Sequence, residues 1–287
     1  MSSIINSKKE IIKYYDQTEF DYKLAWYNKE NPALHFGYYE KEEGADSHYD
    51  ALNHTNKVLA MKAGVTDGNK ILDAGCGLGG SSFFLAKNFN VDVVGISLPA
   101  RQIKNCEERA ATLELKGTTK YVQADFTKTP FEDQTFDVIW ACESVCHASQ
   151  KIDFYQEAYR LLKPDGRLVV AEYLRSKRPL SNEDEKLLKN KWLNNWAIDD
   201  IDSGPEHQAN LEQAGFKNIS IQNVNENMGI SLRNLHEKCT RSYPMEWLLR
   251  LFRIRSQVQH GNLVGSIHQY EAFKKEIWWY GIITATK

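Results

Sequence analysis

The sequence has no long apolar run, no excess of charge of one sign and few cysteines. No stretch of about 18 uncharged apolar residues occurs, so we expect no membrane-spanning helix. The first residues, MSSIINSKKEIIKYYD, lack the apolar core of a signal peptide, which favours a cytoplasmic protein. A net charge of −2 gives no electrostatic reason for nucleic acid to be the main partner.

Cysteine is scarce and lacks the paired spacing of a metal or disulfide framework. The chain has five cysteines, an odd number, and only Cys142 and Cys146 lie four apart. Zinc sites usually show a second pair, and disulfide frameworks usually have an even number. We therefore predict reduced thiols and no metal site. The sequence does not determine the oligomeric state, and a homo-oligomer stays open.

The composition that remains is that of a folded domain. Apolar residues make up 42% and charged residues 26% of the 287 residues, enough for one domain with a full core and a lid. Short β-branched runs alternate with helical patterns from residue 70 onward, which predicts an α/β fold with mostly parallel strands. The expected strands are 70–75, 91–96, 120–123, 136–141, 167–172, 218–222 and 277–284, the last two forming a hairpin-like pair.

The strand order divides the predicted single domain, residues 1–287, into parts. Residues 1–60 are predicted to form a helical, aromatic cap and residues 65–180 a ligand-binding core. Two helical inserts follow the fifth and sixth strands, where a lid belongs. They are 181–200, with Leu188, Trp192 and Trp196 on one face, and 225–265, with a helix over 244–258. Residues 266–287 close the fold with a helix and a strand.

The strongest motif is the glycine-rich loop after the first expected strand, ILDAGCGLGG at 71–80. Glycines let a ligand approach the backbone at the start of the next helix. Gly75, Gly77 and Gly80 also fit the G-x-G-x-x-G pattern of dinucleotide-binding proteins, so that alternative must be weighed.

Two carboxylates separate these alternatives. Asp73 stands two residues before Gly75, where it can accept hydrogen bonds from an ammonium group but would repel a pyrophosphate. Asp125 and Phe126 close the third strand, where a carboxylate can accept from an adenine amine and a ring can pack on the base. Both positions favour S-adenosylmethionine (SAM) over a dinucleotide.

Together these motifs resemble class I SAM-dependent methyltransferases. The motifs D-x-G-x-G at 73–77, A-D-F at 124–126 and L-K-P-D-G at 162–166 carry the resemblance, which covers roughly residues 65–180. It implies a Rossmann-like sheet of seven mostly parallel strands flanked by helices, with SAM as cofactor and a small-molecule acceptor. The cofactor-binding residues predicted in this way are Tyr14, Asp73, Gly75, Cys76, Gly77, Ser97, Gln102, Asp125, Phe126 and Cys142.

The second strand departs from the family pattern. The family usually has an acidic residue there for the ribose hydroxyls, whereas this chain has Ser97, whose hydroxyl binds a ribose more weakly. Gln102, one turn into the next helix, could supply the other contact, or could be a solvated helix residue.

The segment after the fourth strand is the predicted place of the chemistry, following the crevice rule for α/β sheets. Glu143 and His147 are four apart, so in a helical turn they would share a face as base and orienting group. The alternative is that Glu143 binds nearby backbone and His147 caps a loop. ESVCHA at 143–148 is similar to tocopherol and sterol C-methyltransferases, and GISL at 95–98 to the tocopherol type.

The acceptor site is the least determined part. Tyr15, Tyr38, Trp192 and Trp196 are predicted to contact a lipophilic acceptor, and Trp247, Leu248, Leu251 and Phe252 to roof its pocket, although packing on the core would explain the same residues. Arg250 and Arg253, with Arg255 nearby, could grip a diphosphate, form a solvated basic face or rest on a membrane. The leading hypothesis is C- or N-methylation of an isoprenoid-like or otherwise lipophilic acceptor. A small-amine methyltransferase and a non-catalytic SAM-binding protein stay open.

Overall fold

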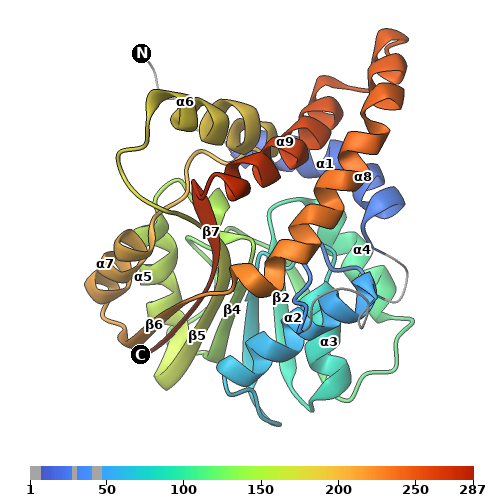
Figure 1. Ribbon diagram of the computed structural model, residues 1–287. Helices are drawn as coiled ribbons and strands as arrows, with labels where there is room; N and C mark the ends of the chain where they lie inside the picture. The colour runs from blue at the N-terminus through green and yellow to red at the C-terminus, as the bar shows by residue number, and fades with distance from the viewer. Residues whose placement is uncertain (1–7, 28–30, 41–46) are drawn as a thin grey trace.

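One mixed sheet forms the centre of the protein (Figure 1). The computed structural model describes residues 8–27, 31–40 and 47–287. In this part of the chain the sheet has seven strands in the order β3-β2-β1-β4-β5-β7-β6. They are β1 (Lys70–Ala74), β2 (Asp92–Ser97), β3 (Thr118–Gln123), β4 (Phe136–Cys142), β5 (Leu162–Arg175), β6 (Lys217–Asn223) and β7 (Trp278–Thr286).

The first five strands are parallel, and β7 runs antiparallel to both of its neighbours, β5 and β6. The predicted fold class is therefore confirmed. The last two strands are neighbours as expected, but two long helices separate them in the chain, so they form no hairpin. β5 begins before the expected strand 167–172 and contains a bulge, because the β4 register shifts from Leu162 to Arg167 and Asp165 has φ +59°.

Alternating strand residues supply two cores, one on each face of the sheet. Ile71 and Val93 face one core, which includes residues of α2 (His48–Lys62) and α3 (Gly80–Asn88). Leu72 and Val94 face the other core, below α5 (Lys151–Leu161) and α7 (Gly204–Ala214). α4 (Ala100–Ala110) packs beside β3 through a smaller cluster around Cys106 and Tyr121.

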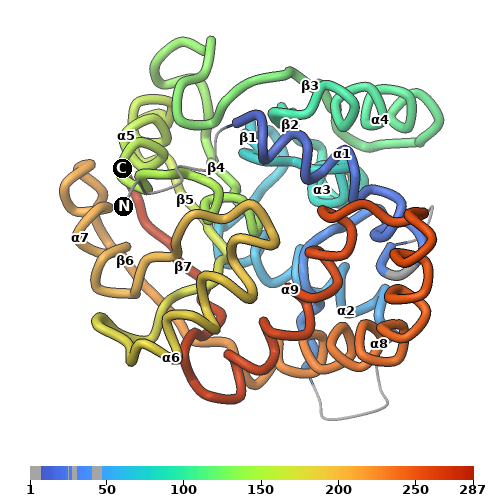
Figure 2. Tube along the Cα trace, turned by 90° about the horizontal axis from the view of Figure 1, so that it is seen from above, coloured from blue at the N-terminus to red at the C-terminus, as the bar shows by residue number. Residues whose placement is uncertain are grey.

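A third layer of helices covers the carboxyl edge of the sheet (Figures 1 and 2). It contains α1 (Lys8–Ala25), α8 (Asn225–Leu251) and α9 (Gln257–Lys274). The insert after β5 adds the short α6 (Asn182–Glu185), which continues as π-helical (Lys186–Trp192) and 3₁₀ (Leu193–Trp196) turns. Leu188, Trp192 and Trp196 are buried together, as their spacing predicted.

Two expectations for this layer are wrong. The helix predicted over 244–258 does not exist as a unit, because α8 runs through Pro244 to Leu251 and α9 starts at Gln257. Ser256 caps α9 with a capping box to Gln259, a start signal that sequence analysis missed. In the described part of the predicted cap, α1 and the segment around Phe36 border the cavity over the sheet edge, whereas α2 packs against the sheet beside α3.

Candidate active site

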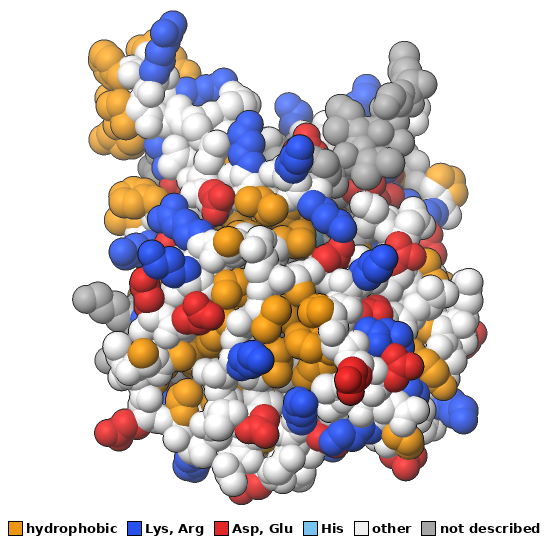
Figure 3. Space-filling model, turned by 180° about the vertical axis from the view of Figure 1, so that it is seen from behind, with side chains coloured by type: hydrophobic (Ala, Val, Ile, Leu, Met, Phe, Trp, Pro, Cys, Tyr) orange, Lys and Arg blue, Asp and Glu red, His pale blue; other side chains and the backbone are white. Residues whose placement is uncertain are grey.

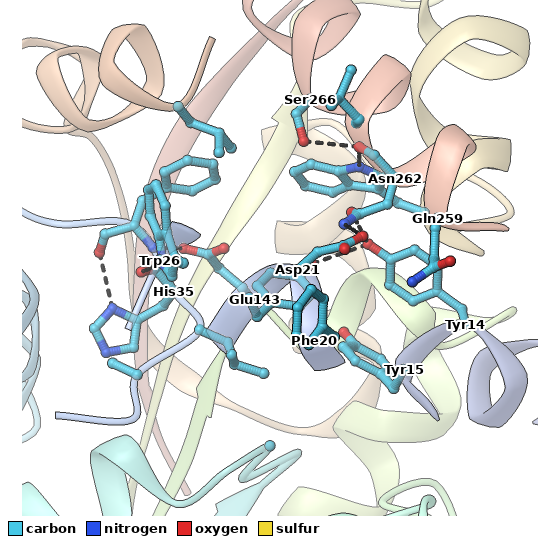
Figure 4. Close-up of a pocket in the computed structure, with 18 of the residues that line it drawn as sticks. Tyr14, Tyr15, Phe20, Asp21, Trp26, His35, Glu143, Gln259, Asn262 and Ser266 are labelled. Atoms are coloured by element: carbon cyan, nitrogen blue, oxygen red, sulfur yellow. Dashed lines mark hydrogen bonds between the residues drawn. The ribbon is translucent and has the colours of Figure 1, made fainter. Parts of the chain in front are cut away.

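A cavity of about 720 Å³ lies between the carboxyl edge of the sheet and the helices above it. Its floor follows the ends of β1, β2 and β4, and its roof comes from α1, α8 and α9. Figure 4 shows Glu143 in the middle of the view, with Tyr14, Gln259 and Asn262 along one side and Trp26 and His35 along the other. The predicted site residues that line it are Tyr14, Tyr15, Asp73, Gly75, Cys76, Gly77, Ser97, Gln102, Phe126, Cys142, Glu143, His147 and Trp196.

The glycine loop is clamped from two sides. The amides of Gly75 and Cys76 both donate to the carbonyl of Ile96, at 3.0 and 2.9 Å. Gly75 has φ +93°, and a Cβ added there would lie 2.4 Å from Cβ of Ser144, whose hydroxyl donates to the carbonyl of Ala74 at 2.6 Å. At Gly80 a Cβ would lie 2.5 Å from Cα of Ala33, so the third glycine lets the N-terminal segment lie against the loop.

Asp73 is a buried carboxylate at the end of β1, where it lines the cavity. The Ser82 hydroxyl, in the first turn of α3, donates to it at 2.6 Å. Burial raises the pKa of Asp73 to about 6, against the hydrogen bonds from Ser82 that lower it. A cation placed beside Asp73 would stabilise its charged form.

At the end of β2 the Ser97 hydroxyl donates to Oε1 of Gln102 at 2.7 Å. Both side chains are buried and line the cavity, so the alternative of a solvated Gln102 is wrong. The two residues form one polar group that presents hydrogen-bonding atoms to whatever occupies this end.

The structure separates the predicted pair Asp125 and Phe126. Phe126 lines the cavity, whereas Asp125 does not. The Asp125 carboxylate is ion-paired with Lys8 and accepts hydrogen bonds from the amide and hydroxyl of Thr127, at 2.9 and 2.8 Å. Burial raises its pKa, but the contacts with Lys8 and Thr127 outweigh this effect and hold it below its usual value. The Asp125 carboxylate is therefore already paired with Lys8.

Glu143 follows β4 in a left-handed backbone conformation, φ +53°, and is not part of a helix. Its Oε1 accepts from the amide of Phe36 and the hydroxyl of Tyr280, each at 2.7 Å, and its Oε2 accepts from the hydroxyl of Tyr173. Burial raises the pKa of Glu143 to about 7, although these hydrogen bonds lower it. The carboxylate is thus held in one orientation and can gain or lose a proton near neutral pH.

Tyr173 and Tyr280 were missed by sequence analysis. They face each other across the antiparallel β5–β7 pair, in direct register. No local motif marks either residue, because their common target, Glu143, becomes visible only when the strand register is known.

His147 ends a single 3₁₀ turn, Val145–His147, so the helical turn predicted to place it on one face with Glu143 is wrong, although both residues line the cavity. Its Nδ1 lies 3.2 Å from the carbonyl of Ala197, which can only accept, so Nδ1 carries the proton. Its Nε2 then accepts from the Tyr15 hydroxyl at 2.8 Å. Burial lowers the pKa of His147 to about 4, which keeps the ring neutral.

Four predicted substrate contacts lie outside the cavity lining. Trp192 is fully buried against Tyr173 and Trp278, and Tyr38 lies beside His54. Arg250 and Arg253 are exposed, and Arg250 donates to Gln257. The pocket roof predicted from Trp247, Leu248, Leu251 and Phe252 is also wrong, because these side chains are exposed and do not line the cavity.

Arg255 lines the cavity, but its charge is already paired. It donates to Glu246 at 2.6 Å and to Asp21 at 2.9 Å, with a second, shorter bond to Asp21. The contact joins α1 to the turn between α8 and α9. We call Arg255, Asp21 and Glu246 the roof ion pair. Two carboxylates leave this guanidinium little capacity to grip a diphosphate.

Within the described residues, no group of three or more His, Cys, Asp or Glu side chains is placed to hold a metal ion. No helix in the same part of the chain is both long enough and apolar enough to cross a membrane.

Part of the chain that forms this site is similar to known methyltransferases. Residues 72–170 match the family model described as a methyltransferase domain. The chain is 32% identical over 208 residues to cycloartenol-C-24-methyltransferase 1 of Oryza sativa subsp. japonica, covering 72% of this chain and 58% of that protein. It is 33% identical over 165 residues to phosphoethanolamine N-methyltransferase 3 of Arabidopsis thaliana, covering 58% and 32%.

A tocopherol O-methyltransferase of Arabidopsis thaliana is 32% identical over 190 residues, covering 63% of this chain and 53% of that protein. The chain thus spans 58%, 32% and 53% of the length of these three relatives. Among solved structures, cyclopropane synthase MmaA2 of Mycobacterium tuberculosis superimposes with a TM-score of 0.83 over 98% of both chains, at 16% identity, which shows the fold.

The glycine loop thus lies within residues that match a methyltransferase domain, on a sheet of Rossmann-like type. The resemblance predicted from the motifs, to methyltransferases that include sterol and tocopherol enzymes, is confirmed.

Proposed function

We propose that this protein is a SAM-dependent methyltransferase whose acceptor is a small lipophilic molecule. The observation that carries the proposal is that one cavity is lined both by the glycine loop with Asp73 and by Glu143 with the side chains of a largely apolar chamber. Described residues of that chamber include Phe20, Leu24, Phe36, Trp196, Leu235, Met245, Leu249 and Leu263.

The floor of the cavity suits SAM on two grounds. The pKa of Asp73 is raised by burial, and only hydrogen bonds from Ser82 counter it, so an ammonium group would find an unneutralised carboxylate there. Ser97 and Gln102 present paired polar atoms for hydroxyl groups, and Phe126 supplies a ring face for a base. When bound, SAM supplies an electrophilic methyl group.

Glu143 is the residue that we place nearest to the chemistry. Its carboxylate is immobilised by Phe36, Tyr173 and Tyr280, and its pKa of about 7 lets it accept a proton from the acceptor or stabilise positive charge that develops there. His147 stays neutral and fixes the Tyr15 hydroxyl, so this pair orients the acceptor and remains uncharged.

The test is a screen of methyl acceptors with the purified protein, read by mass spectrometry as the gain of one methyl group. We expect products from lipophilic compounds such as prenyl diphosphates, prenylated phenols or sterols, and SAM binding measured by calorimetry. Clear turnover of a polar amine with none of these would overturn the lipophilic acceptor. SAM binding without turnover of any acceptor would indicate the non-catalytic alternative.

Methylation of a small amine is the second candidate. It is favoured by the similarity to a phosphoethanolamine N-methyltransferase and by the Glu143 carboxylate, which could pair with an ammonium group. The same screen decides between the two, because glycine, ethanolamine and phosphoethanolamine are included beside the lipophilic compounds.

A further inference from the structure

Large apolar side chains gather at the end of α8 and in the turn that follows, residues 243–254, which we call the apolar tip. In the described part of the chain, seven of the twelve exposed large apolar side chains lie in this segment. Trp247 is 56% exposed and Phe252 68% exposed. The seven are Tyr243, Met245, Trp247, Leu248, Leu251, Phe252 and Ile254.

The apolar tip stands away from the rest of the molecule. In Figure 1 the end of α8 rises above the other helices, and in Figure 3 the corresponding corner is largely hydrophobic, with lysine or arginine side chains beside it. Single exposed apolar residues are normal on protein surfaces, but a contiguous group marks a surface that meets another apolar phase.

The charges around the apolar tip are basic. Within residues 240–257 the exposed charged side chains are Arg241, Arg250 and Arg253. The acidic residue of this segment, Glu246, is buried and paired with Arg255. Apolar side chains combined with arginines fit the interface of an anionic lipid layer, where the rings enter the acyl boundary and the guanidinium groups meet the headgroups.

The apolar tip is continuous with the mouth of the cavity. Met245 and Ile254 belong to the tip, are more than half exposed and also line the cavity. Phe20 and Leu24 of α1 combine the same two properties, at 62% and 76% exposed. A side chain that is exposed and lines the cavity marks its opening, so an apolar path leads from the tip to the interior.

We propose that the apolar tip docks on an anionic lipid surface, with the mouth of the cavity facing the lipid. A second copy of the chain fits this surface less well, because a symmetric contact would bring Arg250 and Arg253 of one copy near those of the other, while Arg241 is paired with Glu237. Docking needs only the tip itself. Entry of a lipophilic acceptor from the lipid layer rests, in addition, on the proposed function.

The test is sedimentation of the full chain with vesicles of equal parts phosphatidylcholine and phosphatidylglycerol, without any acceptor. The double variant Trp247→Ser, Phe252→Ser should bind these vesicles at least about tenfold more weakly, because two large apolar side chains are lost. The matched control is Met61→Ser, Leu113→Ser, which removes two exposed apolar side chains elsewhere and should bind as the wild type does.

A second variant tests the charge. Arg250→Gln with Arg253→Gln should weaken binding to the anionic vesicles by roughly fivefold for each arginine, with little change on vesicles of phosphatidylcholine alone. All the substituted side chains are exposed, so circular dichroism should show unchanged melting.

Three results would overturn the proposal. They are a wild type that does not sediment with the vesicles, a Trp247→Ser, Phe252→Ser variant that binds as well as the wild type, and a dimer in equilibrium centrifugation that this variant converts to a monomer. None depends on methyl transfer, so failure of docking leaves the proposed function standing, and failure of the acceptor screen leaves docking standing.

Discussion

At the floor of the cavity, Asp73, Ser97 and Glu143 each lie at or just after the carboxyl end of a parallel strand, whereas the residues of the roof come from α1, α8 and α9. Backbone hydrogen bonds of the sheet position the floor, and the glycine loop adds two more to Ile96. The roof is joined mainly through side chains, by the roof ion pair and by the bond from the Tyr14 hydroxyl to Asn262 at 2.7 Å.

From this difference we expect the floor to be rigid and the roof to be mobile. The floor cannot move without breaking strand pairing, so it can hold reacting groups in a constant arrangement. The roof can open when a few polar side-chain contacts break, which is the property needed to admit an acceptor and then exclude water. Variants of the floor should therefore change chemistry and cofactor affinity, and variants of the roof should change acceptor exchange.

The largest effect is expected at Glu143. Glu143→Gln keeps the shape but removes the charge and the proton acceptor, so kcat should fall by about 10²-fold or more while SAM affinity stays within about twofold. Steady-state kinetics and calorimetry measure the two quantities. Glu183→Gln, which removes an exposed carboxylate, is the control and should change neither.

The pH dependence sharpens this prediction. Because Glu143 has a pKa of about 7 and acts as a carboxylate, kcat/KM should fall as the pH drops through 7 and level off above it. His147, with its pKa of about 4, contributes no step in this range. A wild-type profile that is flat between pH 5 and 8 would remove Glu143 from the role of base.

Adding a single methyl group to the glycine loop should reduce both stability and SAM binding. Gly75→Ala combines left-handed strain with the contact to Ser144, so we expect a loss of about 2–4 kcal/mol in the free energy of unfolding and weaker SAM binding. Gly68→Ala is a matched control, since φ is +84° there but no atom lies within 4 Å of the added Cβ. It should cost about 1 kcal/mol. Equal losses in chemical denaturation would contradict the clamp described for the loop.

Loss of the roof ion pair should change the stability of the protein less than it changes the amide hydrogen exchange of the roof. Arg255→Met leaves Glu246 buried without its strongest partner, at a cost of about 2 kcal/mol, and should raise the hydrogen exchange of α1. Arg241→Met removes an arginine whose partner, Glu237, is exposed, and should cost less than about 0.5 kcal/mol. If amide exchange in α1 does not change in Arg255→Met, this ion pair does not hold the roof.

The smallest effect is expected at the ribose end. Ser97→Ala removes the hydroxyl that donates to Gln102 and should weaken SAM binding by about three- to tenfold, with little effect on kcat. Thr118→Ala removes a similar hydroxyl bond, to Asp92, at the opposite end of the β2–β3 pair. This control should bind SAM as the wild type does, and an equal weakening in both variants would assign the effect to the strands.

The same comparison explains what the sequence could predict. Floor residues were found because strands end in recognisable patterns, and glycines and carboxylates at those ends have few other reasons to occur together. The roof residues of α8 and α9 were not found, because no local pattern shows that a helix continues through Pro244. Tryptophans at helical spacing give the same sequence pattern whether they face the core, as Trp192 does, or a ligand.

Asp125 shows a further limit. Its position at the end of β3 was predicted correctly, but its partner Lys8 is distant in sequence and belongs to a helix whose placement over the sheet no motif reveals. Direct register between Tyr173 and Tyr280 was equally invisible, since it depends on the last strand running antiparallel beside β5.

That register also has a consequence for how the chain is made. β7 comes after all the other strands in the sequence, yet it supplies Tyr280, one of the three groups that hold Glu143. A nascent chain can pair its first five strands and form the glycine loop while β7 is still being synthesised. Glu143 would then lack Tyr280, so the surroundings of Glu143 should be completed last, after the glycine loop has already folded.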